Sequence, residues 1–171
     1  MNGVLITKLN DFIKANVDKK NLSSFFDELY NLTIDVEKDY PNHKNWFYSK
    51  HLPLSLKNKG RDILIASVKK SLCGVAFVKI REEKKLCTLF VKASERNKGI
   101  GKALLEKSFE ILGTTKPCLS VSQNNLKHLE KYINRYKWKQ SSVKRDKYIM
   151  GQNEIYFNEN KEKKTNNEKK E

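Results

Sequence analysis

The fold is decided by residues 89–103, which read Leu89-Phe90-Val91-Lys92-Ala93-Ser94-Glu95-Arg96-Asn97-Lys98-Gly99-Ile100-Gly101-Lys102-Ala103. The apolar run at the start predicts a strand, and the polar residues after it predict a turn that opens a helix. The first turn of a helix leaves backbone N–H groups unpaired and carries partial positive charge. Glycine at positions 99 and 101 lets a phosphate approach the backbone closely, and Arg96 and Lys102 add full charges. The stretch therefore predicts an anion site at a helix N-terminus.

Two common phosphate motifs do not fit this stretch. A Walker A loop requires Gly and then Ser or Thr at two positions where this chain has Arg96 and Ala103. A dinucleotide fingerprint requires a small residue at position 104, which is Leu, and it sits in a strand–helix–strand unit. We exclude both motifs.

The residues around this stretch indicate the order of the elements. Apolar runs at 63–68, 72–80 and 86–91 are separated by short polar turns, which is typical of an antiparallel meander. Residues 100–113 have helical apolar spacing, 117–121 read as a strand, and 126–136 read as a second helix. Earlier in the chain, residues 4–7 predict a strand and 21–36 a helix, whereas 43–56 are aromatic and irregular. A last pair of strands is expected at 138–150 and 155–157. The order predicts a mixed α/β fold, or α+β, with a mixed, mostly antiparallel sheet flanked by helices.

The stretch resembles the signature of the GNAT superfamily of acyl-CoA-dependent N-acyltransferases. That signature is a strand ending in Val, then x-Pro-x-x-(Arg/Gln)-x-x-Gly-x-(Gly/Ala). Val91, Arg96, Gly99 and Gly101 match it in register, and Ala93 replaces the frequent Pro. The resemblance covers residues 60–150 and implies a GNAT-like sheet, acetyl-CoA as co-substrate and acetyl transfer to a primary amine in a ternary complex.

The resemblance also implies roles for individual residues. In the family the pyrophosphate lies on the backbone amides of the turn, and the pantetheine arm runs along the preceding strand like an extra strand. The amide of Val91 would then donate to the oxyanion. The coenzyme-binding residues predicted in this way are Leu89, Phe90, Val91, Arg96, Asn97, Lys98, Gly99, Gly101, Lys102 and Asn125.

The acid that protonates the leaving thiolate is expected on the second helix. Family members read Asn-x-x-Ala-x-x-x-Tyr, with an aromatic residue five positions after the Tyr. Counting forward from Asn125 selects Tyr132, and counting back from Trp138 selects Ile133, so the helix or its turn carries an extra residue. We assign the role to Tyr132, because its hydroxyl can supply a proton. Packing alone also explains an aromatic residue here, and Tyr136 is a further candidate.

No general base stands out in the sequence. Glu82 and Glu83 lie in a charged loop and are expected to be solvated, and Ser120 and Ser122 alternate on one strand and could hold a water. Glu37, Asp39 and His43 lie near the side where the family binds its acceptor. The histidines His43, His51 and His128 lack metal-ligand spacing, so we predict no metal site.

Composition sets wider limits on the protein. The chain has 171 residues and a net charge of +15; residues 160–171 hold five Lys and three Glu and so contribute +2. That segment has no apolar period, and we expect a single domain at 1–158 followed by a disordered tail at 159–171. The three cysteines, Cys73, Cys87 and Cys118, lie among apolar residues and read as core residues of a chain in a reducing, cytoplasmic compartment. No stretch reads as a membrane helix.

The remaining +13 leaves two other functions open. Basic charge attracts phosphate, so the amine could belong to an aminoacyl-tRNA, as in toxin-type members of the family. The uncertain acid and the lack of an evident base also admit a domain that binds coenzyme A or a partner without catalysis. The sequence does not identify the acceptor, the acyl chain length or the oligomeric state.

Overall fold

The computed structural model describes residues 3–159. They form two compact units, divided between Thr114 and Thr115, and each unit is described by itself. The tail prediction for 160–171 lies outside the described residues, and the single-domain boundary stays a prediction.

The first unit is built on a four-stranded antiparallel sheet in the order β1-β2-β3-β4. Its strands are β1 (Val4–Lys8), β2 (Arg61–Val68), β3 (Ser71–Lys79) and β4 (Lys85–Val91). Its helices are α1 (Leu9–Asn16), α2 (Leu22–Leu32), α3 (His43–Trp46), α4 (Leu52–Leu56) and α5 (Ile100–Leu112). Shorter helical turns are η1 (Lys19–Asn21), η2 (Ile34–Lys38), η3 (Phe47–His51) and η4 (Ala93–Glu95). The predicted meander of three hairpin strands is confirmed, with β1 added at its edge.

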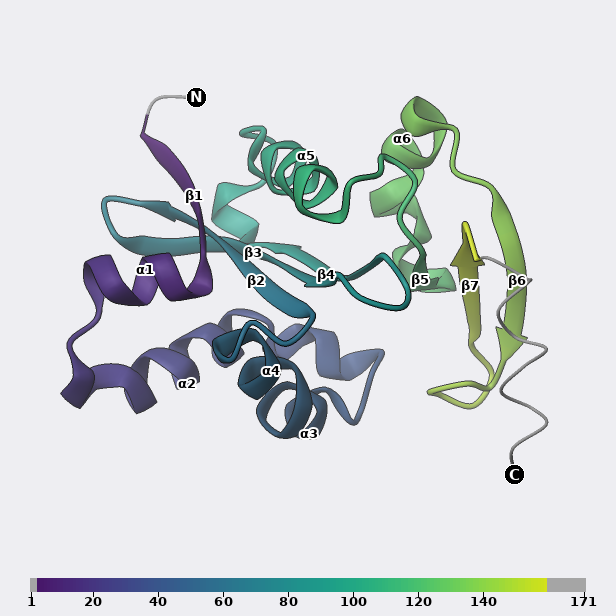
Figure 1. Cartoon of the computed structure of the whole chain (residues 1–171). Helices are drawn as coiled ribbons and strands as arrows, with labels where there is room; N and C mark the ends of the chain where they lie inside the picture. The colour runs from purple at the N-terminus through teal and green to yellow at the C-terminus, as the bar shows by residue number, and fades with distance from the viewer. Residues whose placement is uncertain (1–2, 160–171) are drawn as a thin grey trace. The chain divides into compact units, whose positions relative to one another are not determined.

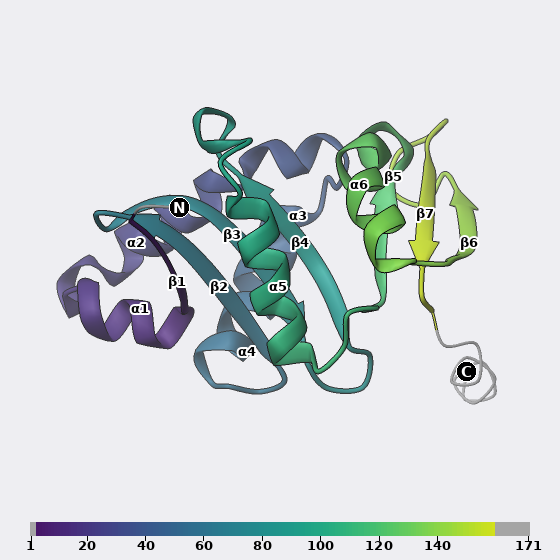
Figure 2. The same ribbon diagram turned by 90° about the horizontal axis from the view of Figure 1, so that it is seen from above.

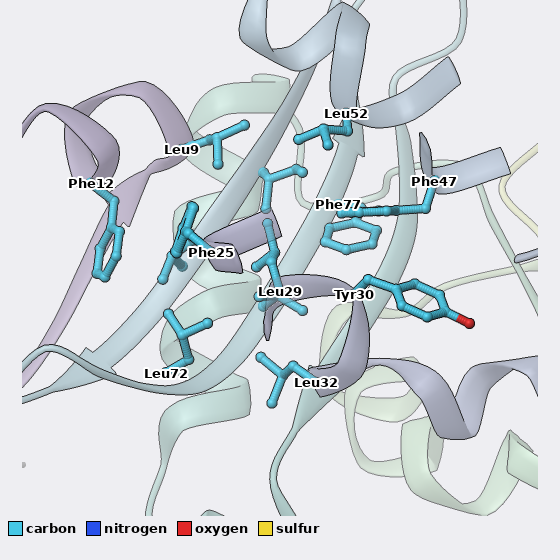
Figure 3. Close-up of a cluster of buried hydrophobic side chains, with 13 residues drawn as sticks. Leu9, Phe12, Phe25, Leu29, Tyr30, Leu32, Phe47, Leu52, Leu72 and Phe77 are labelled. Atoms are coloured by element: carbon cyan, nitrogen blue, oxygen red, sulfur yellow. The ribbon is translucent and has the colours of Figure 1, made fainter. Parts of the chain in front are cut away.

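The sheet is covered on both faces, with α1–α4 on one side and α5 on the other (Figures 1 and 2). This explains why β2 and β3 are buried along almost their whole length and read as continuous apolar runs. Ile63, Ile65, Val75 and Phe77 enter the cluster beneath α1–α4, which Figure 3 draws in close-up. Because side chains alternate along a strand, the buried residues between them face α5.

Gly74 lies inside β3 without breaking the strand. A Cβ at this position would lie 3.1 Å from Leu104 Cδ1 of α5 and 2.9 Å from the carbonyl oxygen of Phe90. The missing side chain therefore lets α5 pack closely on the sheet.

The segment that reads as irregular, 43–56, is instead helical from α3 through η3 to α4. The η3 turn is a π-helix, which inserts an extra residue into the turn and shifts the apolar spacing. The helical period is therefore lost from the sequence although the backbone stays helical. Pro53 lies in the first turn of α4, where a missing N–H costs nothing.

The second unit holds a three-stranded antiparallel sheet in the order β5-β7-β6 and one helix. The elements are β5 (Leu119–Ser122), η5 (Gln123–Asn125), α6 (Leu126–Tyr136), β6 (Gln140–Arg145) and β7 (Asn153–Phe157). Trp138 is buried, and its indole N–H donates to the Thr115 carbonyl over 2.8 Å. The expected fold class, helices flanking mostly antiparallel sheet, is confirmed by the two units.

Candidate active site

The outer edge of β4 carries backbone groups that do not point toward β3. Val91 lies opposite Gly74, and the Lys92 amide donates to the Cys73 carbonyl over 2.9 Å. In an antiparallel ladder this pattern makes Gly74 and Val91 a non-hydrogen-bonded pair. The N–H and C=O of Val91 therefore face the outer edge, and those of Leu89 do so two residues earlier. Phe90 lies between them and directs its backbone groups toward β3.

Arg96 ties the turn to the end of this strand. Its Nε donates to the Val91 carbonyl over 3.1 Å, and its guanidinium carbon lies 5.9 Å from the centre of the Phe90 ring. The Val91 carbonyl is thus occupied, whereas its N–H stays at the edge where the family places the oxyanion donor. Sequence reasoning gave Arg96 only a charge; the structure adds a role in positioning the turn.

The turn ends in a helix start that no side chain caps. Asn97 and Gly99 have φ of 62° and 83°, and Gly99 is the N-cap of α5. The first helical hydrogen bond runs from the Ala103 amide to the Gly99 carbonyl, at 3.0 Å. The amides of residues 100–102 precede this bond and have no intrahelical acceptor. Left-handed residues before such amides form a concave set of donors, which is a favourable anion site.

The charged side chains of the turn make only exposed ion pairs. Lys98 lies 3.1 Å from Glu95, and Lys102 lies 3.7 Å from Glu106. Exposed pairs of this kind contribute about 0–1 kcal/mol, so both ammonium groups can exchange their partner for a phosphate. The residues predicted for the coenzyme between positions 89 and 102 are all in this one unit.

The other two predicted residues, Asn125 and Tyr132, lie in the second unit. Asn125 precedes α6, and its Nδ2 donates to the Ser122 hydroxyl over 3.0 Å. Tyr132 is buried, and the Lys131 ammonium lies 5.0 Å from its ring centre. Tyr136 is half-buried and stacks on Trp138 with ring centres 6.2 Å apart.

The register conflict around Tyr132 has a structural counterpart. Helix α6 runs without interruption to Tyr136, and Lys137 follows with a left-handed φ of 54°. A left-handed residue at this position is a common way for a helix to end. The assignment of the acid to Tyr132 stays a prediction.

The residues expected near the acceptor side are held in hydrogen bonds. The Glu37 carboxylate accepts from the Tyr30 hydroxyl over 2.7 Å and from the Lys44 amide over 3.2 Å. Burial and this carboxylate raise the pKa of Tyr30 to about 12. His43 is buried and contacts the Thr33 hydroxyl over 2.9 Å. Sequence analysis selected Glu37 and His43 but not Thr33 or Tyr30, whose roles depend on contacts between separate helices.

Other candidates have simpler roles. Glu82 is exposed and pairs with Lys79 over 2.9 Å, as expected for a solvated loop. Cys73 and Cys118 are buried thiols. Between residues 3 and 159 no group of three or more His, Cys, Asp or Glu side chains is placed to hold a metal ion. No helix in the same range is long and apolar enough to cross a membrane.

Comparison with protein families identifies the class of enzyme. Residues 37–148 match the model of the acetyltransferase (GNAT) domain, which is more than half of the chain. The chain therefore belongs to the GNAT family of acetyltransferases, and the resemblance seen in residues 89–103 is confirmed.

Solved structures share the fold at low sequence identity. The PaiA N-acetyltransferase of Thermoplasma acidophilum, in complex with coenzyme A, is 19% identical, with TM-score 0.62 and coverage of 92% of this chain and 99% of that one. YncA of Salmonella typhimurium, with its cofactor acetyl-CoA, is 12% identical, with TM-score 0.59 and coverage of 91% and 92%. A ribosomal-protein alanine N-acetyltransferase of Escherichia coli is 14% identical, with TM-score 0.59 and coverage of 90% and 91%. A search of curated protein sequences gives no match.

Proposed function

We propose that the chain transfers an acetyl group from acetyl-CoA to a primary amine by direct attack within a ternary complex. Family membership gives the class of reaction. The similar PaiA and YncA structures hold coenzyme A and acetyl-CoA, which supports the same co-substrate here.

One observation carries this proposal: an uncapped helix start follows directly on a strand edge whose backbone groups point outward. The amides before Ala103 would bind the pyrophosphate, because a helix N-terminus favours negative charge. The outward groups of Leu89 and the Val91 N–H would pair with the amides and carbonyls of the pantetheine arm, as a further strand does. Lys98 and Lys102 would neutralise the phosphates.

The chemistry then requires three groups. The amine must be neutral to attack, and a lysine-like ammonium has a pKa near ~10.4, so a base must take its proton. The nitrogen lone pair forms a bond to the thioester carbon, and an outward amide of β4, Val91 by our assignment, stabilises the oxyanion. The carbon–sulfur bond breaks, and the thiolate takes a proton from Tyr132.

A second acceptor class is favoured by one feature of α6. Lys127, Lys131 and Arg135 are exposed and four residues apart, so they form a basic stripe along one face of the helix. A stripe of this kind attracts RNA phosphates. An aminoacyl-tRNA would supply both the phosphates and a primary amine, so it is our alternative acceptor.

Thiol release from acetyl-CoA tests the proposal, with calorimetry measuring acetyl-CoA binding in parallel. The acceptors are small primary amines, peptides with free α- and ε-amines, and aminoacyl-tRNA at low and high salt. We expect acetyl-CoA to bind and at least one amine to raise thiol release above the hydrolysis rate. Binding without turnover on every acceptor would instead support a non-catalytic coenzyme A domain, and no binding would reject the site.

A further inference from the structure

His43 begins α3 and is held in a buried aromatic cluster. Its ring centre lies 6.4 Å from that of Phe77 at an interplanar angle of 9°, and 6.1 Å from that of Tyr30. Trp46 stacks on it at 5.8 Å. Figure 3 shows Tyr30 and Phe47 beside Phe77 on the face of the sheet beneath α1–α4. The imidazole is therefore fixed in orientation by packing.

The hydrogen bonds around His43 favour one tautomer of its ring. The Thr33 hydroxyl donates to the Tyr30 carbonyl over 3.0 Å, so its single proton is used. With that proton used, we assign the 2.9 Å contact between Thr33 Oγ1 and His43 Nε2 to donation by Nε2–H. The neutral ring consequently carries its lone pair on Nδ1.

This lone pair is not used by the hydrogen bonds of the cluster. Within residues 3–159 Nδ1 makes no hydrogen bond, and the sole buried side-chain nitrogen or oxygen without a partner there is Thr7 Oγ1. Nδ1 therefore has no described hydrogen-bond partner, and the residue as a whole is 5% exposed. His51 in the same cluster differs, because its Nδ1 faces Arg61 at 3.1 Å and its Nε2 faces the Asp62 carbonyl at 3.2 Å.

His43 stacks on Phe77 beside the middle of β4, the strand along which the pantetheine arm is expected. Phe77, on which it stacks, pairs with Thr88, and opposite residues in a ladder direct their side chains to the same face. The next residue along the strand is Leu89, whose backbone groups point to the outer edge. Phe90 packs against the same cluster as Phe77.

The surrounding charges suit a group that gains a proton only briefly. Burial lowers the pKa of His43, and the Glu37 carboxylate opposes part of that effect. Other titratable groups at the cluster are Tyr30 of α2, Lys44 next in the chain, Tyr48, Arg61 over the Trp46 ring, and His51, whose pKa burial lowers to about 3. His43 is thus neutral near pH 7, and Glu37 can stabilise the imidazolium once it forms.

We propose that His43 is the general base of this acetyltransferase, accepting the amine proton on Nδ1 directly or through one water, with Thr33 as its positioning residue. The proposal rests on the proposed function, because it needs an amine acceptor. The amine N–H bond breaks as the nitrogen bonds to the thioester carbon, and the proton moves to Nδ1.

Activity tests the base through His43→Gln, whose amide can still donate to Thr33. General base catalysis contributes about 10²–10⁴-fold, so we expect kcat/KM at pH 7 to fall by that factor while acetyl-CoA affinity is unchanged. In the wild type kcat/KM should fall as pH drops through the His43 pKa, below 6.5, and His43→Gln should lose this dependence. His128→Gln, an exposed histidine, should keep both. Retention of the rate and the acid limb by His43→Gln would overturn the proposal.

A second measurement does not depend on turnover. Long-range imidazole proton–nitrogen NMR spectra of the wild type should show Nε2–H protonated at pH 8 and Nδ1 titrating below pH 6.5. In Thr33→Val the hydrogen bond to Nε2–H is lost, so the ring should no longer be held in this tautomer. We expect kcat/KM to fall about tenfold, the rough value of one positioning hydrogen bond. Thr33→Ser should restore both the tautomer and the rate. A proton on Nδ1 at pH 8 would reject the assignment even if His43→Gln does not fold. If the wild type acetylates no amine, both the proposed function and the base role are rejected. If the wild type is active and His43→Gln has the same kcat/KM, only the base role is rejected.

Discussion

Helices α5 and α6 each follow a strand through a single short helical turn, η4 in the first unit and η5 in the second. Before α5, Asn97 and Gly99 take left-handed φ of 62° and 83°, so the amides of the turn converge. Before α6, Asn125 has φ of −96° and its side chain is used by Ser122. The same order of elements thus places left-handed residues before the helix in one case only, and such residues gather amide donors into the anion site that we predict at α5.

The comparison suggests a division of roles, with α5 binding the coenzyme and α6 supplying a proton. The largest expected effect tests the role of α6 as proton donor and concerns Tyr132. We expect Tyr132→Phe to lower kcat by about 10²–10⁴-fold and to leave the acetyl-CoA Kd unchanged, because the hydroxyl acts in the transition state. Stopped-flow or steady-state thiol release measures it, with Tyr136→Phe as the matched control on the same helix. A large effect of Tyr136→Phe would move the acid by one turn, and no effect of either change would remove the side-chain acid.

The second largest expected effect is a loss of acetyl-CoA affinity when Gly99 is replaced. A valine there resists the left-handed φ and keeps the backbone away from the phosphates. Each hydrogen bond from a backbone N–H to a charged phosphate contributes about 1.5–3 kcal/mol. We therefore expect calorimetry to show a loss of acetyl-CoA affinity on the order of 100-fold. Gly151→Val is the matched control, since Gly151 has a similar φ of 81° and open space around its Cα. Equal Kd values for wild type and Gly99→Val would contradict the site.

The smallest effect concerns Asn125, which stands where α6 begins. We expect Asn125→Ala to weaken acetyl-CoA binding by roughly two- to tenfold, the value of one neutral hydrogen bond of about 0.5–1.5 kcal/mol. Gln123→Ala, an exposed neighbour in the same turn, should leave the Kd unchanged. An Asn125 effect as large as that of Gly99→Val would show that α6 also anchors the coenzyme and would end the division of roles.

The sequence predicted those elements of the fold and of the candidate site that depend on residues close together in the chain. The hairpin strands, the apolar face of α5 and the turn at 96–102 each follow from the spacing of apolar residues and from turn-forming residues nearby. The π-helical turn at Phe47–His51 could not be read, because one inserted residue cancels the helical spacing.

Contacts between residues far apart in the chain could not be predicted from the sequence either. Thr33 and His43 meet through the path of η2, and the outward direction of the Val91 amide depends on its pairing with Gly74. The sequence therefore indicated the coenzyme turn in detail but gave only a list of candidates for the base. Our proposal of His43 among them rests on its packing in the structure.

The outer edge of β4 has a further consequence for the protein before coenzyme A arrives. An unpaired strand edge invites pairing with other chains, and lysines next to such edges oppose it. Lys85 begins β4 and Lys92 follows it, so the edge is charged at both ends, and no further strand of its own sheet pairs with it. A coenzyme that fills the edge as a strand would also act as a folding ligand, adding about 2.7 kcal/mol at one hundred times its Kd. The cell's supply of acetyl-CoA would then set not only the rate of this enzyme but also how long it survives unaggregated.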